Sequence, residues 1–240
     1  MMRAVFVVLC LFPVCGEATR LRLKASVSRG VLDALGIELE ADLSHAVPGA
    51  LIVANHISWI DIFVINAALP SAFVSKEEVR HWPLVGWLAA RSDTVFLRRG
   101  SHGHARIINQ QIAEILGKGN YVAVFPEGTT TNGTHLLHFH AALIQPALAV
   151  GRPVLPVAIS YWGTDGSRSL APGYVGDVSL AQCTLEIAGC KRLVARVTTC
   201  PALGMAGEDR RQVATAAREV ICAGAGLPPP GMADANRLPS

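Results

Sequence analysis

The sequence predicts an α/β fold, with a mostly parallel central sheet flanked by helices and an N-terminal membrane-associated helical segment. Short apolar runs rich in β-branched residues alternate with helical patterns along the chain, which is typical of this class. The 240 residues fit one large domain better than two small ones. Hydrophobic residues make up 51% of the chain and charged residues 16%, against about 25% charged in an average soluble domain. Such a chain can fill a hydrophobic core and still leave apolar surface exposed, which indicates a binding partner for that surface. A membrane is the obvious candidate.

The N-terminal segment combines an apolar run with a basic one. Residues 4–15 form a 12-residue apolar run, and residues 20–29 contain four basic residues and no acid. A membrane span needs about 20 apolar residues, so we expect a shallow helix that lies in the membrane interface. A cleaved signal peptide or short anchor is the alternative for the apolar run, and a solvated helix face for the basic one. We therefore divide the chain into a membrane-associating segment at 1–24, a folded domain at 25–223 and a disordered, Gly- and Pro-rich tail at 224–240.

The elements of the folded domain follow in order. A helical pattern over 25–35 stops at Gly36, which is typical of a C-terminal cap. Strands are then predicted at 51–54, 72–74, 94–97, 121–125 and 154–160, with helices at 60–69, 84–90, 103–116 and 141–150. Towards the C-terminus we expect strands at 184–188 and 193–197 and a last amphipathic helix at 209–223.

Polar residues follow four of these predicted strands. His56, Lys76 and Glu127 come after the first, second and fourth strands, and Arg98 with Arg99 comes after the third. In open α/β sheets the ligand site lies beyond the carboxyl ends of the strands. We therefore expect these side chains to share one cleft.

The segment LIVANHISWID places a histidine, His56, five residues before an aspartate, Asp61. Histidine suits general-base work because its unperturbed pKa of about 6.5 lies near working pH, and a carboxylate on the far ring nitrogen fixes its tautomer. This pairing requires His56 in a loop and Asp61 in the first helical turn. Ser58 and Asp61 also fit a capping-box pattern, so a purely structural Asp61 is the alternative, and both roles can coexist.

No nucleophilic serine or cysteine accompanies this pair. The chain has no G-x-S-x-G elbow, so direct attack by a substrate hydroxyl, deprotonated by His56, is favoured over a covalent intermediate. The net charge of +3 is too small to indicate nucleic-acid binding, and the six cysteines lack metal-ligand spacing. We therefore expect no metal site.

Two further segments indicate substrate binding. Arg98 and Arg99 end the run TVFLRR, where paired guanidiniums suit an anion such as phosphate or carboxylate. In YVAVFPEGTTTNG, a Pro-Glu-Gly turn aims Glu127 into the cleft, with Gly128 and Thr129 beside it. The alternatives are that the two arginines are ordinary surface charges and that the Pro-Glu-Gly segment is a solvated turn.

Together the motifs N-H-x4-D, F-L-R-R, F-P-E-G-T and V-L-P-V-A-I resemble the four ordered blocks of the lysophospholipid acyltransferase family, whose type members are the 1-acylglycerol-3-phosphate acyltransferases. The resemblance covers roughly residues 27–200. It implies an O-acyltransferase domain that moves a fatty acyl group from an acyl-carrier-protein or coenzyme A thioester to the hydroxyl of a lysolipid, at the cytoplasmic face of a membrane. The lysolipid would be lysophosphatidic acid or lyso-ornithine lipid.

The resemblance also implies roles for particular residues. His56 would be the base and Asp61 its partner. Arg98 or Arg99, with Glu127, Gly128 and Thr129, would hold the acceptor head group, and Pro156 would shape the acyl-chain side. Lys76 and Thr130 are further candidates for substrate binding. No metal or redox cofactor is implied.

One position departs from the pattern of phosphate-acceptor members. Those members read E-G-T-R in the third block, whereas Thr130 replaces the arginine here, as in members that acylate lyso-ornithine lipid. Two other functions stay open: a lipid or thioester hydrolase that uses the same pair on water, and a catalytically silent membrane-binding module.

Overall fold

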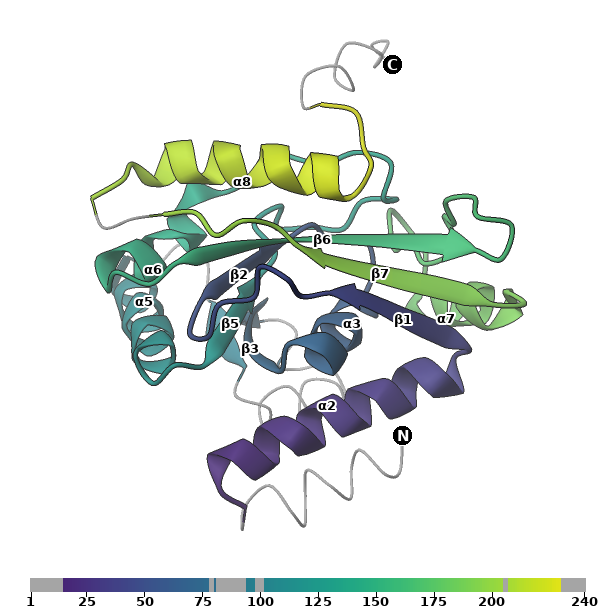
Figure 1. The fold of residues 1–240 in the computed structure, drawn as a ribbon, viewed down its shortest axis with the longest axis horizontal. Helices are drawn as coiled ribbons and strands as arrows, with labels where there is room; N and C mark the ends of the chain where they lie inside the picture. Colours follow the sequence, from purple (N-terminus) through teal and green to yellow (C-terminus); the bar gives the residue numbers. More distant parts are fainter. Residues whose placement is uncertain (1–14, 78–79, 81–93, 98–101, 205–206, 230–240) are drawn as a thin grey trace.

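A seven-stranded sheet runs through the middle of the protein, with helices on both of its faces (Figure 1). The computed structural model describes residues 15–77, 80, 94–97, 102–204 and 207–229. The strands are β1 (Ile37–Asp42), β2 (Leu51–Ala54), β3 (Ser71–Lys76), β4 (Val95–Leu97), β5 (Tyr121–Val124), β6 (Val154–Gly163) and β7 (Leu193–Thr199).

The order of the strands across the sheet is β1-β7-β6-β2-β5-β3-β4. Five of the six neighbouring pairs are parallel, and only β6 and β7 run antiparallel. The expected α/β class, with a mostly parallel sheet and flanking helices, is confirmed. Because β6, β2 and β5 are adjacent and parallel, their carboxyl ends meet at the same edge of the sheet.

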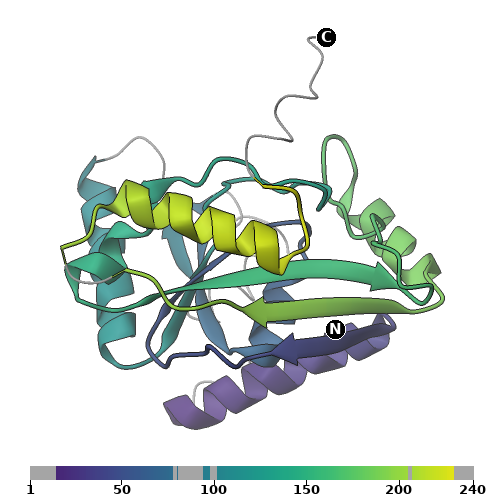
Figure 2. The ribbon, with the colours of Figure 1, turned by 45° about the horizontal axis from the view of Figure 1, so that its top comes forward.

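The helices divide between the two faces. One face carries α2 (Glu17–Ala34), α3 (Asp61–Ala68) and α7 (Leu180–Gly189), and the other carries α5 (His102–Gly117), α6 (Gln145–Ala149) and α8 (Arg210–Gly224). A 3-10 turn, η3 (Ala141–Leu143), precedes α6. Figure 2 shows α8 lying along β6.

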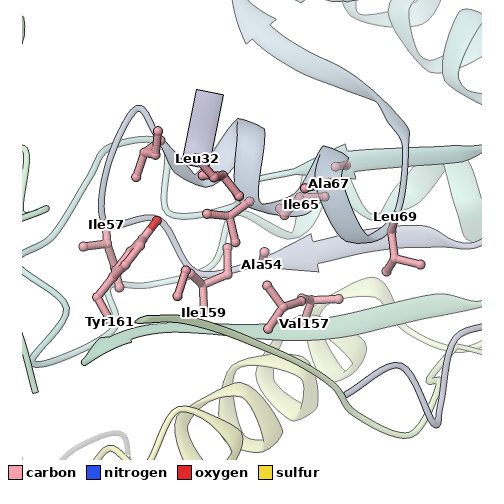
Figure 3. Close-up of a cluster of buried hydrophobic side chains, with 14 of the residues drawn as sticks. Leu32, Ala54, Ile57, Ile65, Ala67, Leu69, Val157, Ile159 and Tyr161 are labelled. Atoms are coloured by element: carbon pink, nitrogen blue, oxygen red, sulfur yellow. The ribbon is translucent and has the colours of Figure 1, made fainter. Parts of the chain in front are cut away.

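Two hydrophobic clusters fill the space between the sheet and these helices. Figure 3 shows part of the cluster on the α2 and α3 side, where Leu32, Ala54, Ile65 and Ile159 pack together. The four residues of β2 are all buried, because helices cover the sheet on both sides. This is why LIVA reads as an unbroken apolar run.

Several elements differ from the expected ones. The strand expected at 184–188 is wrong: this segment lies inside α7, whose N-terminus is capped by the Ser179 hydroxyl accepting from the Gln182 N–H at 3.1 Å. Cys183 and Ile187 then share one buried helix face at a spacing of four residues. Strand β1 was not expected, because it is an edge strand with mostly half-buried or exposed residues. The helix expected at 84–90 lies outside the described residues.

The first described helix, α2, is longer than expected and crosses the boundary placed after residue 24. Two of its basic side chains contact the chain itself. Lys24 Nζ is buried and donates to the carbonyl oxygen of Ser71 at 3.1 Å, and Arg29 donates to that of Ala67 at 3.0 Å. These two cations therefore hold α2 against the end of α3 and the start of β3.

The described residues include no helix that is both long enough and apolar enough to cross a bilayer. Residues 4–14 of the apolar run lie outside the described part. The expected membrane association of the N-terminal segment stays a prediction.

Candidate functional site

The candidate site lies at the carboxyl ends of three neighbouring strands. His56 follows β2 by two residues, Glu127 follows β5 by three, and Tyr161 lies near the end of β6. Asn55, the first residue after β2, ties the end of β2 to β6. Its side-chain amide donates to Ile159 O at 3.0 Å and accepts from Ile159 N–H at 2.8 Å. The residue before His56 is therefore fixed to the sheet.

His56 and Asp61 are paired as expected, with the histidine in a loop and the aspartate at the first residue of α3. His56 Nδ1 lies 2.9 Å from Asp61 Oδ2. An ionised carboxylate only accepts hydrogen bonds, so Nδ1 carries the proton and donates it. The other ring nitrogen, Nε2, is then the one that can take a proton from a substrate.

Asp61 also organises the backbone of the loop. Its Oδ2 accepts from the N–H of Ile57 at 2.7 Å and from the N–H of Ser58 at 2.9 Å. The second of these has the i to i−3 spacing of a capping box, but the N-cap of α3 is Ile60 and not Ser58. The Ser58 hydroxyl instead lies 3.7 Å from the Cys183 sulfur. Asp61 therefore both contacts the His56 ring and holds the backbone of the loop, so its contacts fit both of the roles that the sequence left open.

Tyr161 completes the surroundings of Asp61. Its hydroxyl donates to Asp61 Oδ1 at 2.6 Å, and the side chain of Asp61 is 0% exposed. Burial, with the Asp61 carboxylate beside it, holds the pKa of Tyr161 well above its ordinary value, so the hydroxyl keeps its proton. The Tyr161 ring itself belongs to the hydrophobic cluster of Figure 3. Asp61 is thereby locked between a buried phenol and the His56 loop.

The imidazole ring of His56 is also held by stacking. Its centroid lies 3.9 Å from that of Phe125, and the two ring planes differ by 9°. The side chain of His56 is 19% exposed. Stacking on one face and a hydrogen bond at Nδ1 together fix the direction in which Nε2 points.

Glu127 joins the site through backbone groups. Its Oε1 accepts from the His56 N–H at 2.8 Å, and its Oε2 accepts from the Leu137 N–H at 2.8 Å. Only 4% of the residue is exposed. Burial raises the pKa of Glu127 to about 7; the Asp61 carboxylate adds to the rise, while the two N–H groups and Arg218 oppose it.

The Pro-Glu-Gly turn that aims Glu127 is present as expected. Gly128 adopts φ +71°, and its N–H donates to Phe125 O at 3.1 Å. Further along, the Thr131 N–H donates to His56 O at 2.8 Å. Both backbone groups of His56 are thus held by the segment that follows β5.

A cavity of about 270 Å³ opens beside this segment. The hydroxyl of Thr130, one of its lining residues, donates to the carbonyl oxygen of Tyr174. Within the described part of the chain, His135 is the only titratable side chain on the walls, which are formed by Thr130, Thr131, Asn132, His135, Leu137 and Val175.

The remaining expected site residues divide as follows. Gly128, Thr129 and Thr130 lie in the turn next to Glu127, with Thr129 exposed. Lys76 is the last residue of β3, and only its backbone is described. Arg98 and Arg99 lie outside the described residues. Pro156 is buried within β6.

Sequence reasoning missed three side chains that contact the pair or its neighbours. Tyr161 stands 100 residues from Asp61, and no local pattern connects them. Arg218 stands in α8 and donates to Leu136 O at 2.6 Å. Phe125 was visible as an aromatic residue directly before the Pro-Glu-Gly turn, but its stacking on His56 depends on β2 and β5 being neighbours.

The chain is similar to several known proteins. The sequence profile of a family described as Acyltransferase matches residues 38–160. The 1-acyl-sn-glycerol-3-phosphate acyltransferase of Neisseria meningitidis serogroup B is 40% identical over 201 residues, which cover 82% of this chain and 77% of the relative. The lyso-ornithine lipid O-acyltransferase of Pseudomonas aeruginosa is 43% identical over 169 residues, covering 70% and 65%. The crystal structure of PlsC, the 1-acyl-sn-glycerophosphate (LPA) acyltransferase of Thermotoga maritima, shares the fold with a TM-score of 0.68 at 21% identity, over 100% of this chain and 96% of that one.

Proposed function

The chain belongs to the acyltransferase family, and from this premise we propose that it transfers a fatty acyl group from an acyl thioester to the hydroxyl of a lysolipid. The observation that carries the proposal is the 2.9 Å contact between His56 Nδ1 and the fully buried carboxylate of Asp61. A histidine oriented in this way, with Nε2 left for a substrate, is a general base.

The proposed reaction needs no covalent enzyme intermediate. His56 Nε2 removes the proton from the acceptor hydroxyl, and the oxygen attacks the thioester carbonyl. When the tetrahedral intermediate collapses, the carbon–sulfur bond breaks and the thiolate takes the proton back from the imidazolium. The products are an acylated lipid and a free thiol, and Asp61 stabilises the positive imidazolium between the two steps.

We assign the acceptor head group to the region around Glu127. Two relatives act on different lysolipids according to their names, lysophosphatidic acid in one case and lyso-ornithine lipid in the other. Thr130 stands where phosphate-acceptor members have arginine, and its hydroxyl donates to Tyr174 O. Among the described residues, the walls of the adjoining cavity carry no lysine or arginine. This favours an acceptor of the lyso-ornithine type, with Arg98 and Arg99 as the cations that would accommodate a phosphate instead.

The donor, as we propose it, is an acyl group on acyl carrier protein or coenzyme A, since both present the same thioester. The reaction would take place at the cytoplasmic face of the membrane, where the lysolipid is held. Lys76, at the end of β3, would contribute a further positive charge towards the anionic substrates.

The test is a transfer assay with the purified protein. Each thioester donor is combined with lysophosphatidic acid or lyso-ornithine lipid in mixed micelles, and the acylated lipid and free fatty acid are both quantified. We expect His56→Ala to lower the rate of lipid formation by about 10²–10⁴-fold, the usual contribution of a general base. The matched control is His45→Ala, because His45 is an exposed histidine in the loop before β2.

Three outcomes would overturn the proposal. Wild-type lipid formation by His56→Ala would remove the proposed base. Release of free fatty acid without lipid product would make the protein a hydrolase. Membrane binding with no turnover of either donor would make it a silent binding module.

A further inference from the structure

We propose that Arg218 of α8 is a positioning residue for the catalytic histidine, and that it acts through a single peptide group and the carboxylate of Glu127. This inference rests on the function proposed above. Arg218 touches neither His56 nor Asp61 through any described hydrogen bond, so its influence has to pass through an intermediate.

The intermediate is the peptide group between Leu136 and Leu137. Arg218 Nη2 donates to the carbonyl oxygen of Leu136 at 2.6 Å. The N–H of the same peptide group, carried by Leu137, donates to Glu127 Oε2 at 2.8 Å. A cation on the carbonyl polarises the peptide and makes its N–H a stronger donor.

Glu127 passes this effect on to the histidine. Its second oxygen, Oε1, accepts from the His56 N–H at 2.8 Å. The contacts therefore form one continuous series from the guanidinium to the backbone of His56, by way of Leu136, Leu137 and Glu127. Since both oxygens of Glu127 accept from backbone N–H groups, the series is strongest with the ionised carboxylate.

Charge and burial point in the same direction. Glu127 is 4% exposed, and burying a carboxylate is costly unless an opposite charge or hydrogen bonds compensate. Asp61 adds a second negative charge, whereas Arg218 lowers the pKa of Glu127. The Arg218 Nε is itself buried without a hydrogen-bond partner among the described residues. The positive charge of Arg218 therefore offsets part of the cost of burying the Glu127 carboxylate.

Four titratable or charged groups face Glu127. His56 and Asp61 come from the β2–α3 side, and Arg218 and Cys222 come from α8. Burial raises the pKa of Cys222, so this thiol stays neutral around neutral pH. Arg218 is therefore the permanent cation of the group, and removing it raises the pKa of Glu127. Activity that needs the carboxylate should then be lost at a higher pH than in the wild type.

The experiment compares two substitutions at this position. Arg218→Gln keeps a side-chain donor for Leu136 but removes the charge, and Arg218→Lys keeps the charge. The matched control is Arg211→Gln, an exposed arginine in the same helix. For each full-length variant, kcat/KM for acyl transfer is measured as a function of pH.

We expect Arg218→Gln to move the acid limb of the profile upward by about one pH unit, the size typical of losing one nearby opposite charge. Arg218→Lys and Arg211→Gln should keep the limb at its wild-type position. A limb that stays in place in Arg218→Gln, even with lower activity or a lower Tm, would show a purely structural tether and overturn the inference. So would a limb that moves in Arg218→Lys as far as in Arg218→Gln.

A second measurement does not depend on turnover. The backbone amide signals of His56 and Leu137, followed by NMR as a function of pH, report the ionisation of Glu127 because both N–H groups donate to it. Their midpoint should rise in Arg218→Gln and not in Arg211→Gln. Equal midpoints would contradict the role of Arg218, whereas a wild-type protein that transfers no acyl group would contradict only the proposed function.

Discussion

Replacing Asp61 by asparagine separates the charge of this side chain from its hydrogen bonds. Three donors meet Oδ2, namely His56 Nδ1 and the N–H groups of Ile57 and Ser58, and the Tyr161 hydroxyl meets Oδ1. An asparagine with its carbonyl oxygen in the Oδ2 position keeps the first three. The Tyr161 hydroxyl can rotate and accept from the new amide. Asp61→Asn should therefore fold and lower Tm by no more than about 4 °C.

Its rate of acyl transfer should nevertheless fall sharply. Once His56 has taken a proton, the imidazolium faces the Asp61 carboxylate across 2.9 Å between Nδ1 and Oδ2. For charge centres about 4 Å apart and an effective dielectric constant of about 20, the attraction is about 4 kcal/mol. Its loss corresponds to a decrease in kcat of about 10³-fold.

The assay measures kcat with a saturating donor, together with thermal unfolding, for Asp61→Asn and Asp61→Ala. The alanine variant leaves the buried N–H groups of Ile57 and Ser58 without an acceptor, at a cost of about 1–3 kcal/mol each. Only this variant should lose substantial stability. Wild-type kcat in Asp61→Asn would refute the electrostatic role of Asp61, and a Tm as low as that of Asp61→Ala would refute the proposed arrangement of the amide.

Two further predictions concern the neighbours of the pair. Tyr161→Phe removes the 2.6 Å hydrogen bond to Asp61 Oδ1 but leaves the three donors at Oδ2. We expect kcat to fall by about tenfold and the free energy of unfolding to fall by about 1–2 kcal/mol. An unchanged kcat would show that Tyr161 does not position Asp61. In the folded protein the pKa of Glu127 is raised from its ordinary value of 4.5 to about 7. The stability that this group contributes is therefore fully present below pH 4.5 and is lost as the pH rises through about 7. The loss is on the order of 3 kcal/mol. Over the same range kcat/KM should rise, because the ionised form accepts from both backbone N–H groups. Denaturant unfolding and initial rates across this range, with Glu127→Gln as the reference, check both trends, and parallel unfolding curves for the two proteins would contradict the shift.

The sequence was most informative where local pattern and chemistry coincide. The apolar run at 51–54 is β2 without any change of its bounds, and the spacing of His56 and Asp61 correctly placed one in a loop and the other at the start of a helix. The order of the blocks was also sufficient to indicate the acyltransferase family, which the matched profile confirms.

What the sequence could not provide is the order of the strands across the sheet. His56 and Glu127 meet because β2 and β5 are neighbours, and Tyr161 reaches Asp61 because β6 lies on the other side of β2. These contacts join residues 71 and 100 positions apart, so no local spacing predicts them. The strand predicted at 184–188 was wrong for a different reason. Its β-branched residues suggested a strand, but the cap at Ser179 and the packing of α7 stabilise a helix there.

The way in which α2 is anchored bears on any attempt to shorten the protein. A truncated form that begins at residue 25, at the boundary expected from the sequence, would delete the first eight residues of α2 together with the ammonium group that meets the Ser71 carbonyl oxygen in the interior. A form that begins at residue 16 would discard the apolar run and keep that helix whole. The second form is the one suited to crystallisation, because the complete α2 continues to cover the hydrophobic core.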